Sequence, residues 1–284
     1  MRFLSCRHLG DLRWGVLAGN DTVKLAPTEP WPDLQSWFDA GAPAFDTSAW
    51  ANCALADVEL CAPLPQPRRN LICLGLNYAD HAAEVQGVDI ASVEAPEAPM
   101  FFTKATTAVT GPDCEVVLDE QVTRRLDWEV ELAVIIGRGG RHIPAAEAMH
   151  HVFGYTILND LSARDLQKRH GQFFLGKSMD GSAPMGPWIV SADEIAEPHA
   201  LDVGCSVNGV VKQASNTHNL IFRIPAILET LSRVMTLVPG DIIATGTPGG
   251  VGFVRDPREF LQAGDRVECS IAGIGTLANR IVGV

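Results

Sequence analysis

The pattern of apolar and polar residues predicts more strands than helices in this chain. Short apolar or alternating runs, typical of strands, occur at residues 70–75, 109–111, 128–136, 153–159, 188–191, 201–208, 241–245 and 266–271. Apolar residues at helical spacing predict helices at residues 79–86, 145–151, 162–170 and 224–235. Helices and strands do not alternate regularly, so we expect neither a Rossmann nor a TIM-barrel topology but an α+β fold dominated by a mixed sheet or β-roll.

A proline-rich segment divides the chain into two unequal parts. Residues 63–67 read Pro-Leu-Pro-Gln-Pro, and alternating prolines neither continue a helix nor donate to a sheet. Before this segment, the sequence predicts short strands and one helix near residues 31–40. We therefore expect a small N-terminal α+β domain at residues 1–62 and a larger domain at residues 68–284.

Residues 126–137 carry an unusual combination of acidic and apolar side chains. In a strand, Asp127, Glu129 and Glu131 share one face while the residues between them, all apolar, share the other. The run then becomes continuously apolar, as in a strand buried on both faces. A buried carboxylate needs a partner, and a divalent cation such as Mg²⁺, Ca²⁺ or Mn²⁺ suits two neighbouring glutamates. The alternative is a strand whose acids face water, and this segment supports both interpretations equally.

Two further groups could contribute to a site. Asp160 follows the strand at residues 153–159 and could be a third oxygen ligand, or it could cap the helix that begins near Ser162. His81 and Glu84 stand three apart on a helix, so an imidazole could act as a base oriented by an acid, although this spacing also occurs by chance. The adjoining segment 85–99 is typical of a mobile loop, which would let the pair close over a substrate.

The remaining candidates are a helix face, a lysine and a glycine-rich segment. Arg164 and Gln167 share one face of the helix predicted at 162–170. Lys177 lies between glycine and small polar residues, where it could point into a site or be a solvated lysine in a turn. Residues 244–252 are rich in glycine, so their backbone N–H groups could approach an anion, a carboxylate for example, or form a tight turn.

Charge and cysteine usage narrow the classes of function. The net charge of −12 argues against a nucleic-acid or acidic-membrane partner but allows an anionic small molecule beside a bound cation. The seven scattered cysteines contain no Cys-x-x-Cys pair, which indicates reduced thiols in a cytoplasmic protein. The N-terminus lacks the apolar run of a signal peptide, and no apolar stretch approaches the roughly 20 residues that span a bilayer.

These motifs together resemble the fumarylacetoacetate hydrolase superfamily, in particular its bacterial acylpyruvate and fumarylpyruvate hydrolase-like members. The matching segments run in the same order over residues 68–284. They are Gly-Leu-Asn-Tyr-Ala-Asp-His at 75–81 with Glu84, Phe-Thr-Lys at 102–104, Asp-Trp-Glu-Val-Glu at 127–131, Asn-Asp-Leu-Ser-Ala-Arg-Asp at 159–165 with Gln167, Gly-Lys-Ser at 176–178, Val-Asn-Gly at 207–209, and Pro-Gly-Asp-Ile-Ile-Ala-Thr-Gly-Thr-Pro at 239–248. Residues 1–62 resemble only loosely the small N-terminal domain of many bacterial members.

The resemblance implies a mixed β-sandwich roll, usually dimeric, with Mg²⁺ or Mn²⁺ held by Glu129, Glu131 and Asp160; Ca²⁺ would be a non-catalytic occupant. It implies that His81 and Glu84 lie on a lid and activate water. Lys177 would be catalytic. Arg164, Gln167 and Thr247 would contact the substrate, and Thr247 would help to bind the substrate's carboxylate.

The expected activity is therefore that of a catabolic hydrolase that cleaves a carbon–carbon bond in a 2,4-dioxo acid through a pyruvate enolate. The alternative is decarboxylation, tautomerisation, isomerisation or dehydration of a 2-oxo acid at the same site. A third possibility, a catalytically silent metal-binding protein, would not require His81, Glu84 or Lys177.

Overall fold

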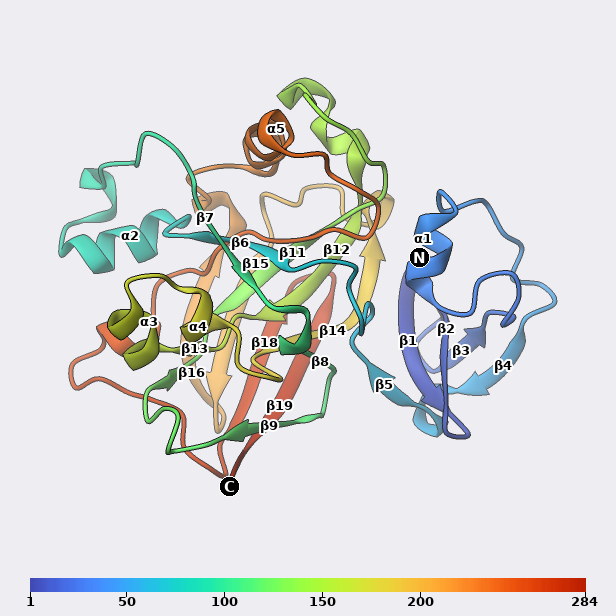
Figure 1. Cartoon of the computed structure of the whole chain (residues 1–284), viewed down its shortest axis with the longest axis horizontal. Coiled ribbons are helices and arrows are strands. Elements are labelled where there is room, and N and C mark those ends of the chain that lie inside the picture. Colours follow the sequence, from blue (N-terminus) through green and yellow to red (C-terminus); the bar gives the residue numbers. More distant parts are fainter.

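The computed structural model describes all 284 residues, and most of its strands belong to one large and one smaller sheet (Figure 1). The large sheet has twelve strands, ten of them in the order β4-β3-β2-β1-β14-β12-β11-β17-β6-β7, while β5 pairs with β1 and β8 with β14. Its strands are β1 (Arg2–His8), β2 (Asp11–Ala18), β3 (Thr22–Leu25), β4 (Ala51–Ala54), β5 (Glu59–Cys61), β6 (Leu71–Gly75), β7 (Met100–Lys104), β8 (Val109–Thr110), β11 (Val130–Ile136), β12 (Val152–Asn159), β14 (Ala183–Ser191) and β17 (Ile242–Ala244).

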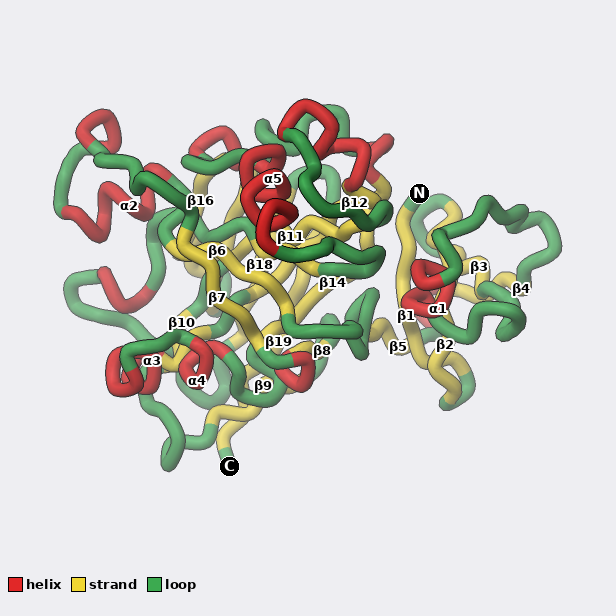
Figure 2. Tube along the Cα trace, turned by 45° about the horizontal axis from the view of Figure 1, so that its top comes forward, coloured by secondary structure: helices red, strands yellow, loops and turns green.

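The smaller sheet has five strands in the order β16-β15-β18-β19-β9. They are β9 (Glu115–Leu118), β15 (Asp202–Val207), β16 (Val210–Asn216), β18 (Arg266–Ile271) and β19 (Gly275–Gly283), and a separate pair joins β10 (Leu126–Asp127) to β13 (Ser162–Ala163). The helices are α1 (Leu34–Asp39), α2 (Ala79–Gln86), α3 (Arg164–His170), α4 (Phe174–Lys177) and α5 (Ile224–Val234). Both views place α2, α3 and α4 at the end of the molecule away from the N-terminal strands (Figures 1 and 2).

Strand β11 lies at the centre of the large sheet, between β12 and β17, and is buried along its whole length. Leu132, Val134 and Ile136 point into the main core, which they share with residues of β15, β18, β19 and α5. Ala133 and Ile135 point the opposite way, into a second core that includes residues of the N-terminal strands. Since side chains alternate along a strand, Glu129 and Glu131 belong to the face of this second core, and their carboxylates are buried.

The N-terminal strands continue the large sheet. Strand β1 pairs with β14, and the second core joins Phe3, Trp14 and Trp37 to residues of β11, β12 and β14. Trp37 stacks on Phe3 and meets the ring of Phe153, on β12, edge-on with centroids 5.5 Å apart. Residues 1–62 therefore share both backbone pairing and apolar packing with the rest of the chain.

Several predicted elements are shifted or of another type in the structure. The strand expected at 128–136 is interrupted at Trp128 and Glu129, which separate β10 from β11. The helix expected at 162–170 begins only at Arg164, because Ser162 and Ala163 pair with β10. The helix expected at 145–151 is a 3-10 helix that follows Pro144. The sequence did not predict the strands β4, β5, β7, β9, β16 and β19 or the helix α4.

No helix of the structure is both long and apolar enough to cross a bilayer.

We expect the chain to unfold in a single cooperative transition, because the second core spans both parts of it. Replacing Trp37 by Ala should lower the free energy of unfolding by about 3–5 kcal/mol, the usual cost of truncating a buried aromatic side chain. Urea unfolding followed by fluorescence and by far-UV circular dichroism measures the number of transitions and the free energy of unfolding. Trp50→Ala, at a half-buried residue whose ring neighbours are only Trp14 and Phe45, is the control and should cost less. Two separate transitions in the wild type would contradict the shared core.

Candidate active site

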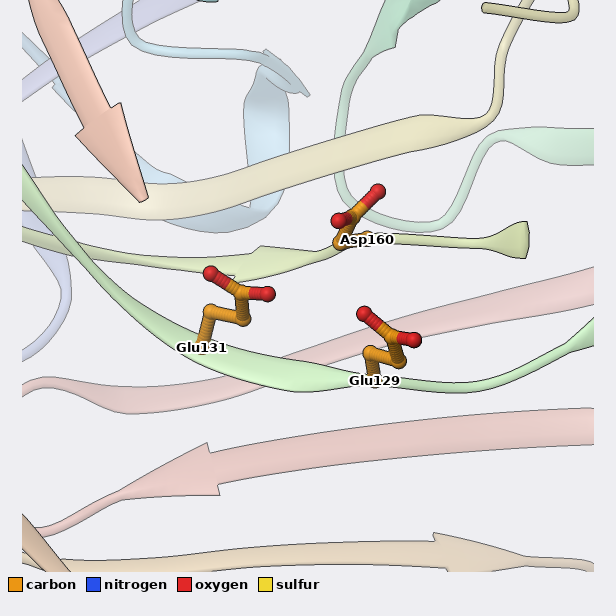
Figure 3. Close-up of side chains that lie close together, drawn as sticks. All are labelled: Glu129, Glu131 and Asp160. Carbon is orange, nitrogen blue, oxygen red and sulfur yellow. The ribbon is translucent and has the colours of Figure 1, made fainter. Parts of the chain in front are cut away.

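Three buried carboxylates meet where β11 and β12 lie side by side. Glu129 and Glu131 stand at the start of β11, and Asp160 directly follows β12 (Figure 3). Val130 is paired with Asn159, and the Asp160 N–H donates to the Glu129 carbonyl over 2.9 Å, which fixes the two segments in register. Each carboxylate has an oxygen within 4.8 Å of the other two. The predicted acidic face is therefore a buried cluster rather than a solvated strand.

Two buried lysines and a partly buried arginine surround the acidic cluster. The Nζ of Lys177 lies 2.7 Å from Glu129 Oε2 and 2.6 Å from Asp160 Oδ2, and the Nζ of Lys104 lies 2.6 Å from Asp160 Oδ1. Arg164 binds Glu129 through Nη2 at 2.5 Å and Asp127 through Nε at 2.8 Å. Three cations thus face four carboxylates.

Glu131 is the carboxylate that has no cationic partner. Its Oε2 accepts the Gly246 N–H at 2.7 Å, whereas its Oε1 is buried without any hydrogen-bond partner. Burial and the neighbouring Asp160 and Glu129 charges raise the pKa of Glu131 well above its usual range. Burial alone would raise the pKa of Glu129 as well, but Lys177 and Arg164 outweigh it and lower that pKa.

The unpartnered oxygen and the all-oxygen donor set fit a divalent cation. Carboxylate oxygens are the ligands that Mg²⁺, Mn²⁺ and Ca²⁺ prefer, and a doubly positive ion would compensate the excess negative charge of the cluster. Glu129, Glu131 and Asp160 are the residues that would hold it, and Lys177 would share two of these carboxylates with the ion.

A glycine loop, residues 246–253, binds carboxylates through its backbone. The Gly246 N–H donates to Glu131, the Gly249 N–H to Asp80, the Gly250 N–H to Glu84, and the N–H groups of Gly252 and Phe253 to Asp127. The anions that the glycine-rich segment approaches are therefore the protein's own. Residues 246–253 thus contact helix α2, the acidic cluster and Asp127, the carboxylate that binds Arg164.

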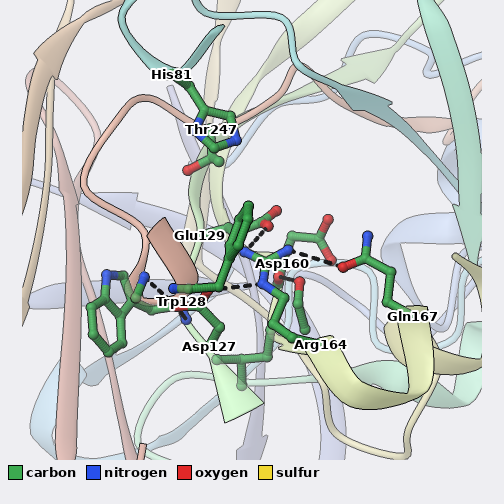
Figure 4. Close-up of polar contacts among 12 residues, drawn as sticks. His81, Asp127, Trp128, Glu129, Asp160, Arg164, Gln167 and Thr247 are labelled. Carbon is green, nitrogen blue, oxygen red and sulfur yellow. Dashed lines mark hydrogen bonds and ion pairs between the residues drawn. The ribbon is translucent and has the colours of Figure 1, made fainter. Parts of the chain in front are cut away.

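Helix α2 has the predicted bounds and carries His81 and Glu84 on one face. The Nδ1 of His81 lies 3.6 Å from Glu84 Oε2 and has no hydrogen-bond partner, while the Glu84 carboxylate accepts the Gly250 N–H. Burial would raise the pKa of Glu84, but His81 and the Gly250 N–H outweigh it and lower that pKa. Figure 4 shows His81 and Thr247 together on one side of Glu129, with Arg164 and Gln167 beside it.

Most of the candidate residues line one cavity of about 390 Å³; Glu84, Glu131 and Asp160 do not, so the acidic cluster reaches this cavity only through Glu129. Phe253 stands in its wall, with the Arg164 guanidinium 4.3 Å from its ring centroid and the His81 ring edge-on to it. Other aromatic residues, Phe102, Phe173 and Phe260, complete an apolar part of the wall. Six of the predicted site residues line this cavity: His81, Glu129, Arg164, Gln167, Lys177 and Thr247.

The structure adds a detail to the prediction for each of four parts of the site. Lys177 lines the cavity and is not a solvated lysine in a turn, because the acidic cluster holds its ammonium group in the interior at the end of α4. Asp160 does not cap a helix, since its side chain binds the two lysines. Thr247 uses its hydroxyl hydrogen on the Val130 carbonyl, so that hydrogen is not free for a substrate carboxylate. Arg164 and Gln167 share a face as expected, and they bind each other over 3.2 Å.

Sequence reasoning assigned no role to Lys104 or Asp80. Lys104 ends the short strand β7 and is fully buried against Asp160, so a lysine at the end of the apolar run Met-Phe-Phe at 100–102 was the available signal. Asp80, next to His81, binds the Gly249 N–H and the Ser215 hydroxyl and anchors the start of α2. Only the fold brings residues 215 and 249 to this helix, so no local pattern could reveal that role.

A family model described as fumarylacetoacetate (FAA) hydrolase C-terminal matches residues 70–282. The chain belongs to the fumarylacetoacetate hydrolase family. The oxaloacetate tautomerase YisK of Bacillus subtilis is 51% identical over 80% of this chain and 74% of its own length. A mitochondrial oxaloacetate tautomerase of Homo sapiens is 44% identical over 80% of this chain and 70% of its own.

Solved structures agree with this membership of the fumarylacetoacetate hydrolase family. The fumarylacetoacetate hydrolase of Exiguobacterium antarcticum superposes over the full length of both chains with a TM-score of 0.90 and 38% identity. A 5-carboxymethyl-2-hydroxymuconate delta-isomerase of Mycobacterium smegmatis also covers both chains fully, with a TM-score of 0.81 and 35% identity. The predicted fold class, a mixed β-sandwich roll with a small N-terminal part, is thereby confirmed.

We expect Glu131→Gln to abolish stabilisation by a divalent cation. Mg²⁺ at a concentration of about 100 times its Kd should stabilise the wild type by about 2.7 kcal/mol, and this gain should largely disappear in the variant. Without metal the variant should be at least as stable as the wild type, because a neutral amide avoids the free-energy cost of either protonating the buried Glu131 or burying its charge. Thermal unfolding with Mg²⁺ and with EDTA measures this, with Glu115→Gln, at an exposed strand position, as the control. Full Mg²⁺ stabilisation of Glu131→Gln would refute the ligand assignment.

We expect Gly250→Ala to release α2 from the glycine loop. Gly250 has φ +98°, and an added Cβ would lie 2.1 Å from the Lys212 carbonyl oxygen. Gly264 has the same φ but open space around it, so Gly264→Ala should cost only the backbone strain, about 1–2 kcal/mol. Hydrogen exchange should be faster at residues 79–86 in Gly250→Ala and unchanged there in Gly264→Ala. Equal protection of α2 in both variants would contradict the anchoring role.

Proposed function

We propose that this protein is a divalent-metal-dependent tautomerase that interconverts the keto and enol forms of a 2-oxo acid of the oxaloacetate type. The observation that carries the proposal is the 51% identity to an oxaloacetate tautomerase over 80% of the chain. The second support is the site itself, in which one carboxylate of the oxygen-ligand cluster (Glu129), the buried ammonium group of Lys177 and the imidazole of His81 line one cavity.

Tautomerisation needs a base for a carbon-bound proton and stabilisation of the charge that develops on the 2-oxo oxygen. The C3–H bond breaks, a C2–C3 double bond forms, and the oxygen on C2 gains a proton, so that no water is consumed. A cation held by Glu129, Glu131 and Asp160 would supply Lewis-acid polarisation of the 2-oxo group. Lys177, beside the same carboxylates, would place a second positive charge near that oxygen.

His81 is the group best placed to move the proton. Its Nδ1 faces Glu84, which favours the tautomer with the hydrogen on Nδ1 and leaves Nε2 as an acceptor. The ring lines the cavity, whereas Glu84 is anchored by the glycine loop. His81 would therefore be the base, and Glu84 would orient it and stabilise its protonated form.

Arg164 and Gln167 would orient the substrate from the opposite side. Arg164 is held by Asp127 and Glu129 and packs on Phe253, so its guanidinium cannot swing away from the cavity. Gln167 keeps its amide hydrogens available, because only its oxygen is bonded to Arg164. Both residues thus offer N–H donors to a carboxylate.

Hydrolysis of a 2,4-dioxo acid, the main expectation from the sequence, stays a second candidate. The observation that favours it is the His81–Glu84 pair, which could equally activate a water molecule. The two reactions share the enolate and differ in whether water attacks a distal carbonyl.

Two assays on the Mg²⁺-loaded protein separate the candidates. A tautomerase should accelerate the decay of enol absorbance in oxaloacetate solutions and release no pyruvate from an acylpyruvate. The reverse outcome would replace the tautomerase proposal by hydrolysis.

We expect His81→Ala to lower kcat for tautomerisation by about 10²- to 10⁴-fold, the usual contribution of a general base. Metal binding should persist, because His81 is not in the acidic cluster. Glu84→Gln should lower kcat less, since the imidazole remains. Asp89→Asn, an exposed change just beyond α2, is the matched control and should leave kcat unchanged. Undiminished kcat in His81→Ala would remove His81 from the mechanism.

A further inference from the structure

Three basic side chains without any partner converge on the mouth of the cavity. Arg125, Lys168 and Arg258 all line it, and all three are exposed. Their side chains donate no hydrogen bond within the protein, and none of them forms an ion pair. Arg125 and Lys168 also line the adjoining surface depression, so they stand where the cavity opens to the surface. Mutual repulsion disfavours such a cluster unless something negative binds there.

The cluster contrasts with its surroundings. The chain has a net charge of −12, and three other basic residues nearby are engaged, although Arg169, outside the cavity, is not. Arg124 pairs with Glu120, Lys212 pairs with Glu259, and Arg255 bonds to the carbonyls of Gly250 and Lys212. An acidic protein thus places three unpaired cations at the entrance of the candidate active-site cavity.

Helix α3 sets the distance between the two ends of the cavity. Arg164 and Lys168 are four residues apart and therefore lie on one face of the helix, about 6 Å apart along its axis. Arg164 contacts the acidic cluster at the inner end, and Lys168 lies at the mouth. This span is comparable to the separation of the two carboxylates in a short-chain diacid.

We propose that Arg125, Lys168 and Arg258 form a distal anion subsite, which binds the second carboxylate of a 2-oxo diacid whose 2-oxo end lies at the acidic cluster. The subsite rests on the proposed function for the orientation of the substrate. It makes charge at the far end of the substrate the basis of specificity, while the apolar wall of Phe102, Phe173 and Phe260 contacts the carbons between the ends.

Binding of matched pairs of acids to the Mg²⁺-loaded protein tests the subsite without requiring turnover. The pairs are 2-oxoglutarate with 2-oxopentanoate and 2-oxoadipate with 2-oxohexanoate, which differ only in the distal carboxylate. Calorimetry should show the diacid of at least one pair binding more than tenfold more tightly. Lys168→Gln and Arg258→Gln should each reduce that preference about two- to fivefold, and the affinity for the monoacids should not change.

Arg169→Gln is the matched control, because Arg169 neighbours Lys168, is exposed and unpaired, and lines only the surface depression. It should retain the full preference for the diacid. Equal affinities within both pairs, or an equal loss in Arg169→Gln, would overturn the subsite. A protein that prefers diacids but does not tautomerise oxaloacetate would support the subsite and refute the proposed function. A protein that tautomerises oxaloacetate but binds diacids and monoacids equally would support the proposed function and refute the subsite.

Discussion

The excess of buried carboxylates over buried cations is the constraint on which this site depends. Asp127, Glu129, Glu131 and Asp160 lie in the interior, and only Lys104, Lys177 and Arg164 compensate them. Uncompensated charge in a protein interior is costly, so the site either keeps Glu131 protonated, as its raised pKa favours, or binds a further cation. A divalent ion held by Glu129, Glu131 and Asp160 would be that cation, and the same ion would provide the Lewis acid for enolate chemistry.

The glycine loop holds two of these carboxylates, and the helix that carries His81, in fixed positions. One short segment donates backbone N–H groups to four carboxylates that come from α2 and from the acidic strand. Such N–H groups hold anions without adding a side chain that would fill the cavity. The base-bearing helix and the acidic cluster are therefore positioned by the same backbone, and a change in this loop affects both at once.

The N-terminal region supports the site from behind. Its aromatic residues pack on the face of β11 and β12 that also carries Glu129 and Glu131, and β1 extends the sheet through β14. The apolar packing thus keeps the acidic strand in place, while the cavity on the other end stays open to solvent between α2, α3 and the glycine loop.

The sequence by itself determined the acidic strand, the third acid after β12, the bounds of α2 and the family, because alternation, helical spacing and collinear motifs are local properties. It could not decide whether Glu129 and Glu131 bind a metal or face water on an exposed strand. It also could not identify the contacts of Lys104, Asp80 or the glycine loop. Those roles depend on contacts between residues as distant as 80 and 249. The tertiary structure decided that Lys177 is buried and that Arg125, Lys168 and Arg258 meet at one cavity mouth. The physical reason is that burial and charge pairing arise only when separate segments pack together, and no local pattern records which segments these are.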